Sequence, residues 1–281
     1  FGPNDRSHLC VRYNRWLGDA AFAAGHQPEW VLHFGATPVT RHLQNYLGNA
    51  AGIHALVDPW PRWNDPAHRL THLLRADPVL LCEALLAEQP SPAPSSWRAG
   101  FVEAENNASA DSAALHIPAL LAELPGDYAV FIGNSLAIRQ LDSNSGSAGK
   151  SLRFYGNRGA SGIDGNISTA AGVAAVHGRV LALLGDLTCQ HDLGGLALLQ
   201  GRDAIIVAAN NGGGGIFDYL PQAALPEFDA GWRTPQQISF EHAALTFGLT
   251  YQAADDANGL RTALRAALAA GGPQLIELRL S

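Results

Sequence analysis

Two stretches of the sequence place polar side chains directly after apolar runs, where those side chains could bind a ligand. The run LALLGD ends in Asp186, and the run AIIVAANN ends in Asn211, which four glycines follow. One crossover would join the two strands that these runs predict, so the strands should be near neighbours in a parallel sheet. Asp186, Asn211 and a carbonyl of the glycine run would then offer only oxygen ligands. Such a set suits a small hard cation such as Mg²⁺.

Each motif also has a purely structural interpretation. Gly-Asp is common where a strand turns into a helix, and Asn-Asn-Gly is common in loops. The pair is more specific than either half, because one helix and one strand separate Asp186 from Asn211. Glycines at 212–215 would also let the backbone approach a ligand without obstruction by side chains.

Apolar runs and amphipathic segments predict the elements that position these residues. The strands lack polar alternation, which is typical of a parallel sheet covered on both faces. We therefore expect a doubly wound, mostly parallel α/β sheet, with polar loops at the carboxyl ends of its strands. Strands are predicted over 30–35, 51–59, 127–135, 180–186, 204–211 and 273–280, a short strand with a loop over 152–162, and helices over 78–88, 116–125, 164–178, 192–200, 240–249 and 258–270.

The composition of the chain varies along its length in a way that predicts its organisation. The stretch QPSPAPSSWRAG (89–100) is rich in proline and serine, which indicates a linker or a surface excursion. We expect part of one α/β domain over 1–95, a linker over 96–115 and a second α/β domain over 116–281.

Charge and cysteine content exclude several classes of protein. The 281 residues carry a formal net charge of −7, which gives no general attraction for nucleic acid or an anionic membrane. No apolar run approaches the ~20 residues that a membrane span requires. The three cysteines show no disulfide or zinc spacing, which favours a reducing cytoplasm. The sequence begins at Phe1 and contains no methionine, and we expect it to be a fragment.

The GD…NN pair resembles the metal and diphosphate motif of thiamine-diphosphate (ThDP) enzymes. In that family the aspartate, the last asparagine and the carbonyl two residues later hold the ion. The matching positions are Asp186, Asn211 and Gly213, although this sequence has GDL where many members have GDG. The resemblance implies ThDP with Mg²⁺ or Mn²⁺ as cofactors, and Gly185 as a cofactor-binding residue.

Further motifs resemble one branch of these enzymes, the 2-succinyl-5-enolpyruvyl-6-hydroxy-3-cyclohexene-1-carboxylate (SEPHCHC) synthases, or MenD family. They are FIGNSLAIR (131–139), GNRGASGIDGNISTAAG (156–172) and FEHAA (240–244). The resemblance is continuous from about residue 116 and looser over 1–90, which is similar to part of the middle domain of that family. It implies decarboxylation of 2-oxoglutarate and addition of the product to isochorismate, a step of menaquinone biosynthesis.

The resemblance also implies substrate-binding residues. Arg139 and Arg158 would clamp the carboxylates of the two dicarboxylate substrates, for which arginine is well suited. Asn134 and Ser135 could donate hydrogen bonds to the same anions, or they could cap the following helix. Arg41 lies in GATPVTRHL (35–43), which resembles a middle-domain loop whose basic residue can reach the substrate.

Apolar residues would complete the cofactor site. Ile163 matches the large residue that supports the bent cofactor, and Ile216, Phe217 and Leu220 resemble the pocket wall, although all four could be ordinary core residues. His242 is expected to be structural, because it lies near the start of a predicted helix, and Cys189 is expected to be buried packing, because it has no evident base partner.

The resemblance implies that the activating half of the site is elsewhere. ThDP enzymes of this type need a glutamate on a pyrimidine-binding domain, and the cofactor lies between that domain of one subunit and the diphosphate domain of another. Nothing before residue 116 is similar to that domain, so the chain alone should be inactive and the whole enzyme should be at least a homodimer. Two alternatives stay open: another ThDP carboligase, such as an acetolactate synthase relative, or a noncatalytic diphosphate-binding module.

Overall fold

The computed structural model describes residues 9–60, 62–109, 111–146 and 150–280. The chain divides into two compact units, Phe1–Ser109 and Ala110–Ser281. The division falls inside the range 96–115 that the sequence predicts as a linker. All of the predicted site residues lie among the described residues.

The first unit contains a small parallel sheet. Its three strands lie in the order β1-β2-β3, with Trp30 opposite Ile53 and Ala55 opposite His72. Its elements are α1 Tyr13–Trp16, α2 Ala20–Gly25, β1 Trp30–Phe34, α3 Arg41–Gly48, β2 Ile53–Val57, β3 His72–Leu74, α4 Pro78–Ala87 and α5 Ser95–Asn107.

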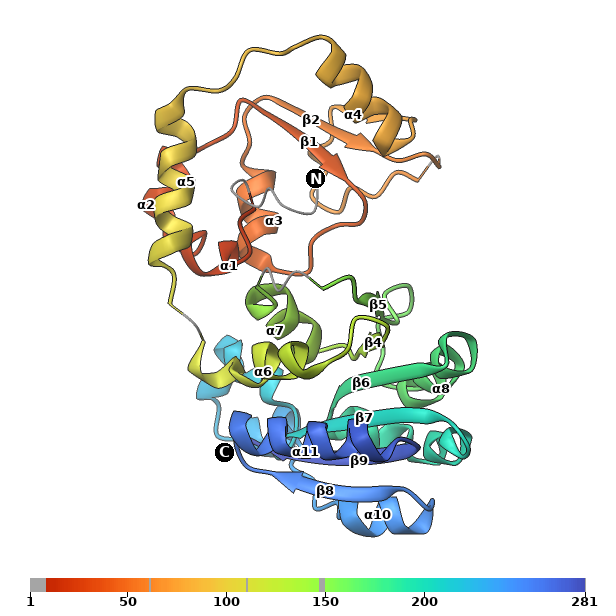
Figure 1. Cartoon of the computed structure of the whole chain (residues 1–281). Coiled ribbons are helices and arrows are strands. Elements are labelled where there is room, and N and C mark those ends of the chain that lie inside the picture. Colours follow the sequence, from red (N-terminus) through yellow and green to blue (C-terminus); the bar gives the residue numbers. More distant parts are fainter. Residues whose placement is uncertain (1–8, 61, 110, 147–149, 281) are drawn as a thin grey trace. The chain divides into compact units, whose positions relative to one another are not determined.

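The second unit contains a larger sheet with helices between its strands (Figure 1). Its first half comprises η1 Ser112–Ala114, α6 His116–Glu123, β4 Ala129–Ile132, α7 Leu136–Asn144, β5 Arg153–Tyr155, α8 Asn166–His177, β6 Arg179–Gly185 and α9 Asp186–His191. Its second half comprises η2 Leu193–Leu199, β7 Asp203–Asn210, η3 Gly215–Tyr219, η4 Pro221–Ala224, η5 Asp229–Arg233, α10 Phe240–Thr246, β8 Thr250–Ala254, α11 Ala257–Ala270 and β9 Pro273–Arg279.

Every strand of the larger sheet is parallel to its neighbours. The order is β5-β4-β6-β7-β9-β8, and β6 and β7 pair over seven residues from Arg179 opposite Asp203 to Gly185 opposite Ala209. The carboxyl ends of all six strands therefore meet at one edge of the sheet. This arrangement confirms the predicted doubly wound parallel fold.

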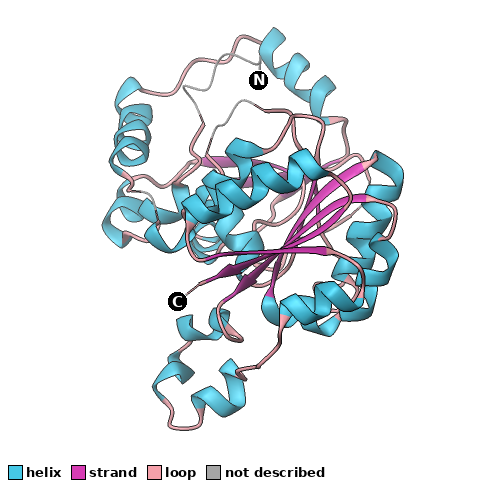
Figure 2. Ribbon diagram, turned by 60° about the horizontal axis from the view of Figure 1, so that its bottom comes forward, coloured by secondary structure: helices cyan, strands magenta, loops and turns pink. Residues whose placement is uncertain are grey.

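Helices cover both faces of this sheet, and successive strand residues alternate between two buried clusters (Figure 2). Leu181 of β6 packs on the face covered by α6 and α11, whereas Ala182 packs on the face covered by α8, η2 and α10. Because both faces are buried, the strands can be apolar at nearly every position. Each fully buried leucine or isoleucine contributes about 1.5–3 kcal/mol, so the central strands form a firm support for the loops at their ends.

Three local features differ from the sequence predictions. The helix α5 begins at Ser95, inside the predicted linker or surface excursion, because Trp97 and Phe101 provide an apolar face that packs with other rings of the same unit. The predicted helix 192–200 is the 3-10 helix η2, in which two consecutive glycines disfavour a regular α-helix. The strands β3 and β8 were not predicted, because neither has a continuous apolar run.

Within the described part of the chain, we find no helix that combines the length and the apolar character needed to cross a membrane.

Candidate functional site

The carboxyl ends of β4, β6 and β7 border a cavity of about 160 Å³ within the second unit. The sequence analysis predicted nine of the nineteen residues that line it, and these nine come from four separate motifs. The predicted site residues that line the cavity are Asn134, Ser135, Ile163, Gly185, Asp186, Asn211, Gly213, Ile216 and Phe217.

Asp186 is the buried carboxylate of this cavity. It starts α9 directly after β6, and only 5% of its surface is exposed. Its Oδ1 accepts from its neighbour, the Leu187 amide, at 2.8 Å, and its Oδ2 accepts from the Gly213 amide at 2.8 Å. Burial raises the pKa of Asp186, although the backbone amides around it act in the opposite direction. A carboxylate that is desolvated in this way gains from a nearby cation.

Asn211 is the second residue that the sequence analysis predicts as an oxygen ligand. Its Oδ1 is buried, and no group in the described residues donates a hydrogen bond to it. Buried amide oxygens are normally paired, so this one fits an additional ligand in the cavity. The described residues contain no cluster of three or more His, Cys, Asp or Glu side chains. A metal here would therefore need amide and carbonyl oxygens beside the single carboxylate, as the sequence predicts for Mg²⁺ or Mn²⁺.

The backbone of Gly213 requires glycine. Its φ is +137°, and a Cβ there would collide with the Arg233 carbonyl and lie 3.3 Å from the Pro235 Cα. Its amide donates to Asp186, and its carbonyl accepts from the Gly215 amide at 2.9 Å. The carbonyl keeps a second lone pair for a metal ion.

Arg233 holds this glycine turn, and the sequence analysis did not identify it. Its guanidinium donates to the Asn211 carbonyl at 2.9 Å and forms an ion pair with Asp218. Its own carbonyl accepts from the Gly214 amide at 2.7 Å. No motif marks this arginine, which is the last residue of η5, so only the fold connects it to the site.

Asn134 and Ser135 lie where β4 turns into α7. Asn134 is buried, and its Nδ2 donates to the carbonyls of Asn157 and Gly162 at 3.1 and 2.7 Å. Asn134 thus joins β4 to the loop that carries Ile163. Ser135 has a φ of +65° and makes no capping hydrogen bond with its side chain. A non-glycine residue in this backbone region is strained by roughly 1–3 kcal/mol, and such strain is concentrated at functional sites.

The two predicted substrate arginines lie near each other beside this turn. Arg139 donates to the Ser135 carbonyl at 2.8 Å, and Arg158 donates to Asn134 Oδ1 at 2.6 Å. Burial, and then the nearby Arg158 guanidinium, lower the pKa of Arg139. Neither arginine forms an ion pair with a carboxylate of the described residues. Two close guanidinium groups without a carboxylate are suited to binding an anion.

Three predicted residues are placed differently from the rest. Leu220 follows η3 and is 36% exposed, but it does not line the cavity that Ile216 and Phe217 border. Arg41 is the first residue of α3 in the first unit, and its side chain is exposed. His242 bonds through Nδ1 to Ser239 Oγ at 2.7 Å, and that oxygen also caps α10, which fits a structural role.

Comparison with known proteins gives one consistent result. Residues 144–278 match the family described as thiamine pyrophosphate enzyme, C-terminal TPP binding domain. The chain is 62% identical, over 99% of its length, to a protein of Dechloromonas aromatica named 2-succinyl-5-enolpyruvyl-6-hydroxy-3-cyclohexene-1-carboxylate synthase. Proteins of the same name from Salinibacter ruber and Geobacillus thermodenitrificans are 39% and 35% identical over 94% and 100% of the chain. The chain covers 52%, 47% and 50% of these three proteins, and so spans about half the length of the curated relatives it matches.

Proposed function

Because this chain belongs to the SEPHCHC synthase family of ThDP-dependent enzymes, we propose that it provides the diphosphate- and metal-binding half of such a synthase. The observation that carries the proposal is the pairing of the buried Asp186 carboxylate with the unpartnered Asn211 Oδ1 in one cavity. Each directly follows one of two neighbouring parallel strands, and both fit a hard cation that carries a diphosphate.

The metal site would comprise Asp186, Asn211 and the Gly213 carbonyl, with Mg²⁺ or Mn²⁺ as the ion. Gly185 leaves room for the diphosphate, while Ile163, Ile216 and Phe217 provide an apolar wall. The cofactor, when bound, supplies the stabilised carbanion chemistry by which 2-oxo acids lose CO₂. The contribution of the protein is to orient that cofactor and to exclude water from its apolar side.

Arg139 and Arg158 would bind the carboxylates of 2-oxoglutarate and isochorismate. Both guanidinium groups lie next to the Ser135 turn, which borders the cavity, so a carboxylate held by them would be close to the cofactor. The side-chain amide of Asn134 donates to two backbone carbonyls, and the role of this residue would be to hold the turn and the Arg158 side chain. Ser135 keeps its hydroxyl free of a capping bond and could donate to the same anion.

The half of the relatives that this chain does not match would supply the pyrimidine-binding domain and its glutamate. On this proposal the synthase is at least a homodimer in the cytoplasm, with each cofactor shared between two subunits. Arg41 would approach the substrate from the first unit. The net charge of −7 supports the absence of nucleic acid among the partners.

The test uses the intact natural protein that carries this sequence, and this chain alone beside it. The intact protein should consume 2-oxoglutarate and isochorismate only with ThDP and Mg²⁺ or Mn²⁺, and it should decarboxylate 2-oxoglutarate in preference to pyruvate. The chain alone should bind ThDP weakly and should not turn over. A preference for pyruvate would favour an acetolactate synthase relative, and binding of ThDP without turnover by the intact protein would indicate a noncatalytic module.

A further inference from the structure

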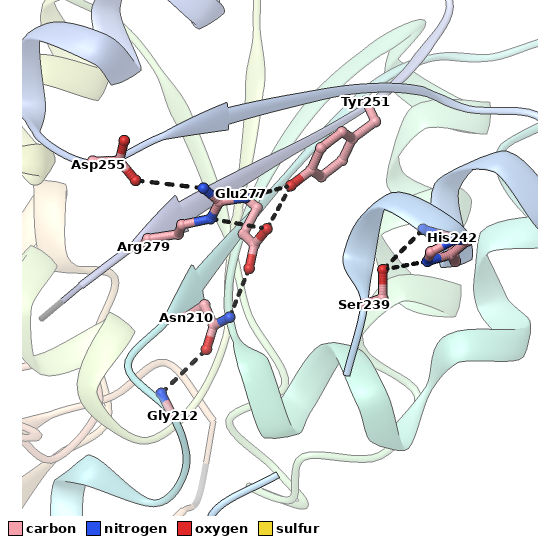
Figure 3. A network of polar contacts seen from close by, with 8 residues as sticks. All are labelled: Asn210, Gly212, Ser239, His242, Tyr251, Asp255, Glu277 and Arg279. Carbon is pink, nitrogen blue, oxygen red and sulfur yellow. Dashed lines mark hydrogen bonds and ion pairs between the residues drawn. The ribbon is translucent and has the colours of Figure 1, made fainter. Parts of the chain in front are cut away.

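A second acidic residue, Glu277, is buried in the sheet and is connected through Asn210 to the turn of the candidate metal site. It lies in β9 within the apolar sequence PQLIELR and is 7% exposed. A carboxylate in such a position is costly unless several groups pair with it. Glu277 has three such partners, from three different strands of the sheet (Figure 3).

Two of these partners hold the carboxylate on one side. The Tyr251 hydroxyl donates to Oε2 at 2.5 Å, and Arg279 Nε lies 3.5 Å from the same oxygen. Burial and the hydrogen bond to Glu277 raise the pKa of Tyr251 to about 12, so its hydroxyl stays a donor. Arg279 also donates to the Tyr251 hydroxyl at 3.3 Å and pairs with the exposed Asp255. The position of Glu277 is thus fixed from β8 and β9.

The third partner leads to the glycine turn. Asn210, the last residue of β7, donates from Nδ2 to Glu277 Oε1 at 2.7 Å. Its Oδ1 accepts from the Gly212 amide at 3.1 Å. Since a carboxylate only accepts and an amide N–H only donates, these two partners fix the orientation of the Asn210 carboxamide.

The two adjacent asparagines therefore have different tasks. Asn210 points toward Glu277 and folds the backbone of the turn, whereas Asn211 keeps a buried, unpartnered Oδ1 in the cavity. The amide of Gly213, the next residue but one, then reaches Asp186. Two hydrogen bonds thus connect Glu277 through Asn210 to the Gly212 amide, which lies in the backbone between the two proposed ligands Asn211 and Gly213.

We propose that Glu277 is a positioning residue that acts through Asn210 to set the Asn211–Gly213 turn in the geometry that binds the metal and the diphosphate. This inference rests on the proposed function. Outer groups of this kind orient metal ligands, and their loss typically weakens metal binding about 10- to 100-fold.

The experiment measures the affinity of the intact protein for Mg²⁺ at saturating ThDP, by isothermal titration calorimetry, together with its unfolding by urea. Glu277→Ala and Asn210→Ala should each weaken Mg²⁺ binding at least about tenfold. Glu277→Gln keeps an acceptor for Asn210 and should restore part of the affinity. The double variant should bind no more weakly than Asn210→Ala, because both changes break the same connection. Asp255→Asn, which removes only the exposed partner of Arg279, is the matched control and should bind as the wild type does.

Unchanged Mg²⁺ affinity in Glu277→Ala would overturn the inference, even if the variant were less stable. The proposal would also be overturned if the double variant lost Mg²⁺ affinity by the product of the two single-variant factors, since Glu277 would then act independently of Asn210. If Glu277→Ala does not fold, Asn210→Ala and Tyr251→Phe test the proposal in its place, because each removes one hydrogen bond to the Glu277 carboxylate. Unchanged Mg²⁺ affinity in both variants would contradict the proposal. Failure of the wild type to bind ThDP and Mg²⁺ would contradict the proposed function itself. Normal binding by the wild type together with unchanged Mg²⁺ affinity in Glu277→Ala would contradict only this inference.

Discussion

The Asp186 carboxylate accepts a hydrogen bond from the Gly213 amide, with 2.8 Å between Oδ2 and nitrogen. This bond joins the end of β6 to the turn after β7. The two strands are paired as far as Gly185 and Ala209, so the connection needs no third element. The pairing of these two strands therefore places the residues predicted to hold a cation around one cavity. Such preorganisation lowers the cost of assembling a site.

Replacement of Asp186 by asparagine tests the predicted carboxylate ligand. The change keeps the size of the side chain but removes its negative charge, and a direct ligand should matter more than the outer groups whose loss costs about 10- to 100-fold. We expect Asp186→Asn to weaken Mg²⁺-dependent ThDP binding at least about a hundredfold by calorimetry. Asp127→Asn, an exposed carboxylate paired with Arg179, is the control and should bind normally. Equal affinity of the two variants would contradict the metal site.

Two neighbouring glycines offer a matched pair of alanine substitutions. At Gly212, with a φ of +74°, a Cβ meets nothing within 4 Å, so Gly212→Ala should cost only the roughly 1–2 kcal/mol of a left-handed backbone. At Gly213 a Cβ would collide with the Arg233 carbonyl, so the turn must move. We expect Gly213→Ala to lose more unfolding free energy in urea and most of its ThDP affinity. Similar behaviour of the two variants would show that the turn is not tightly held.

The sequence predicts where Asp186 and Asn211 lie in the fold, because each directly follows a strong strand. Asp186 and Asn211 terminate apolar runs on adjacent parallel strands, and parallel strands bring their carboxyl ends together regardless of side-chain detail. The same argument does not predict β8, whose sequence TYQAA shows no apolar run and which, among the strands that the structure describes, pairs with β9 alone. Edge strands of this kind depend on contacts that no local pattern records.

The residues that hold the site were not predictable in this way. Arg233 reaches the Asn211 carbonyl across 22 positions, and Glu277 reaches Asn210 across 67. A glutamate inside an apolar strand gives a signal of its own, since an unpaired buried carboxylate is unfavourable. That signal predicts that a partner exists, but the identity of the partner depends on strand order, which is a property of the whole sheet.

The three cysteines should differ in their reactivity toward a thiol reagent. Cys82 is exposed, whereas Cys189 is buried against the β6–β7 core, and burial raises the pKa of its thiol. Because the thiolate is the reactive form, Cys189 should react only when the protein unfolds. A chromogenic disulfide reagent added to the native protein at pH 8 should modify Cys82 first, and it should modify Cys189 only after urea is added. Rapid modification of Cys189 in the native protein would contradict its buried position, and Cys82→Ser identifies the fast phase.

His116 should make the stability of the second unit depend on pH. It is 3% exposed at the start of α6, and burial lowers its pKa from the ordinary 6.5, although a hydrogen bond to the Gln140 side chain and the charge of Asp111 oppose this. In the unfolded chain the ordinary pKa returns, so below pH 6.5 the unfolded state binds the proton more readily. Stability is therefore full above that pH and falls as the pH drops toward the lowered value. Urea unfolding at pH 7.5 and 5.5 should show a smaller pH effect in His116→Gln than in the wild type. The exposed His191→Gln is the control and should leave the pH effect unchanged.

The guanidinium of Arg158 should affect substrate binding without affecting the cofactor. It lies beside Arg139 and is oriented by Asn134 Oδ1 at 2.6 Å, and it forms no ion pair with a carboxylate of the described residues. A charged hydrogen bond contributes about 1.5–3 kcal/mol, so its loss should raise KM for one dicarboxylate substrate about ten- to a hundredfold. We expect Arg158→Ala to show this increase in steady-state kinetics of the intact protein, with ThDP affinity unchanged in calorimetry. Arg158→Lys should restore little, because an ammonium cannot form the paired contacts of a guanidinium. A fall in kcat with unchanged KM for both substrates, or an equal loss of ThDP affinity, would place Arg158 in the support of the loop and not in contact with the substrate.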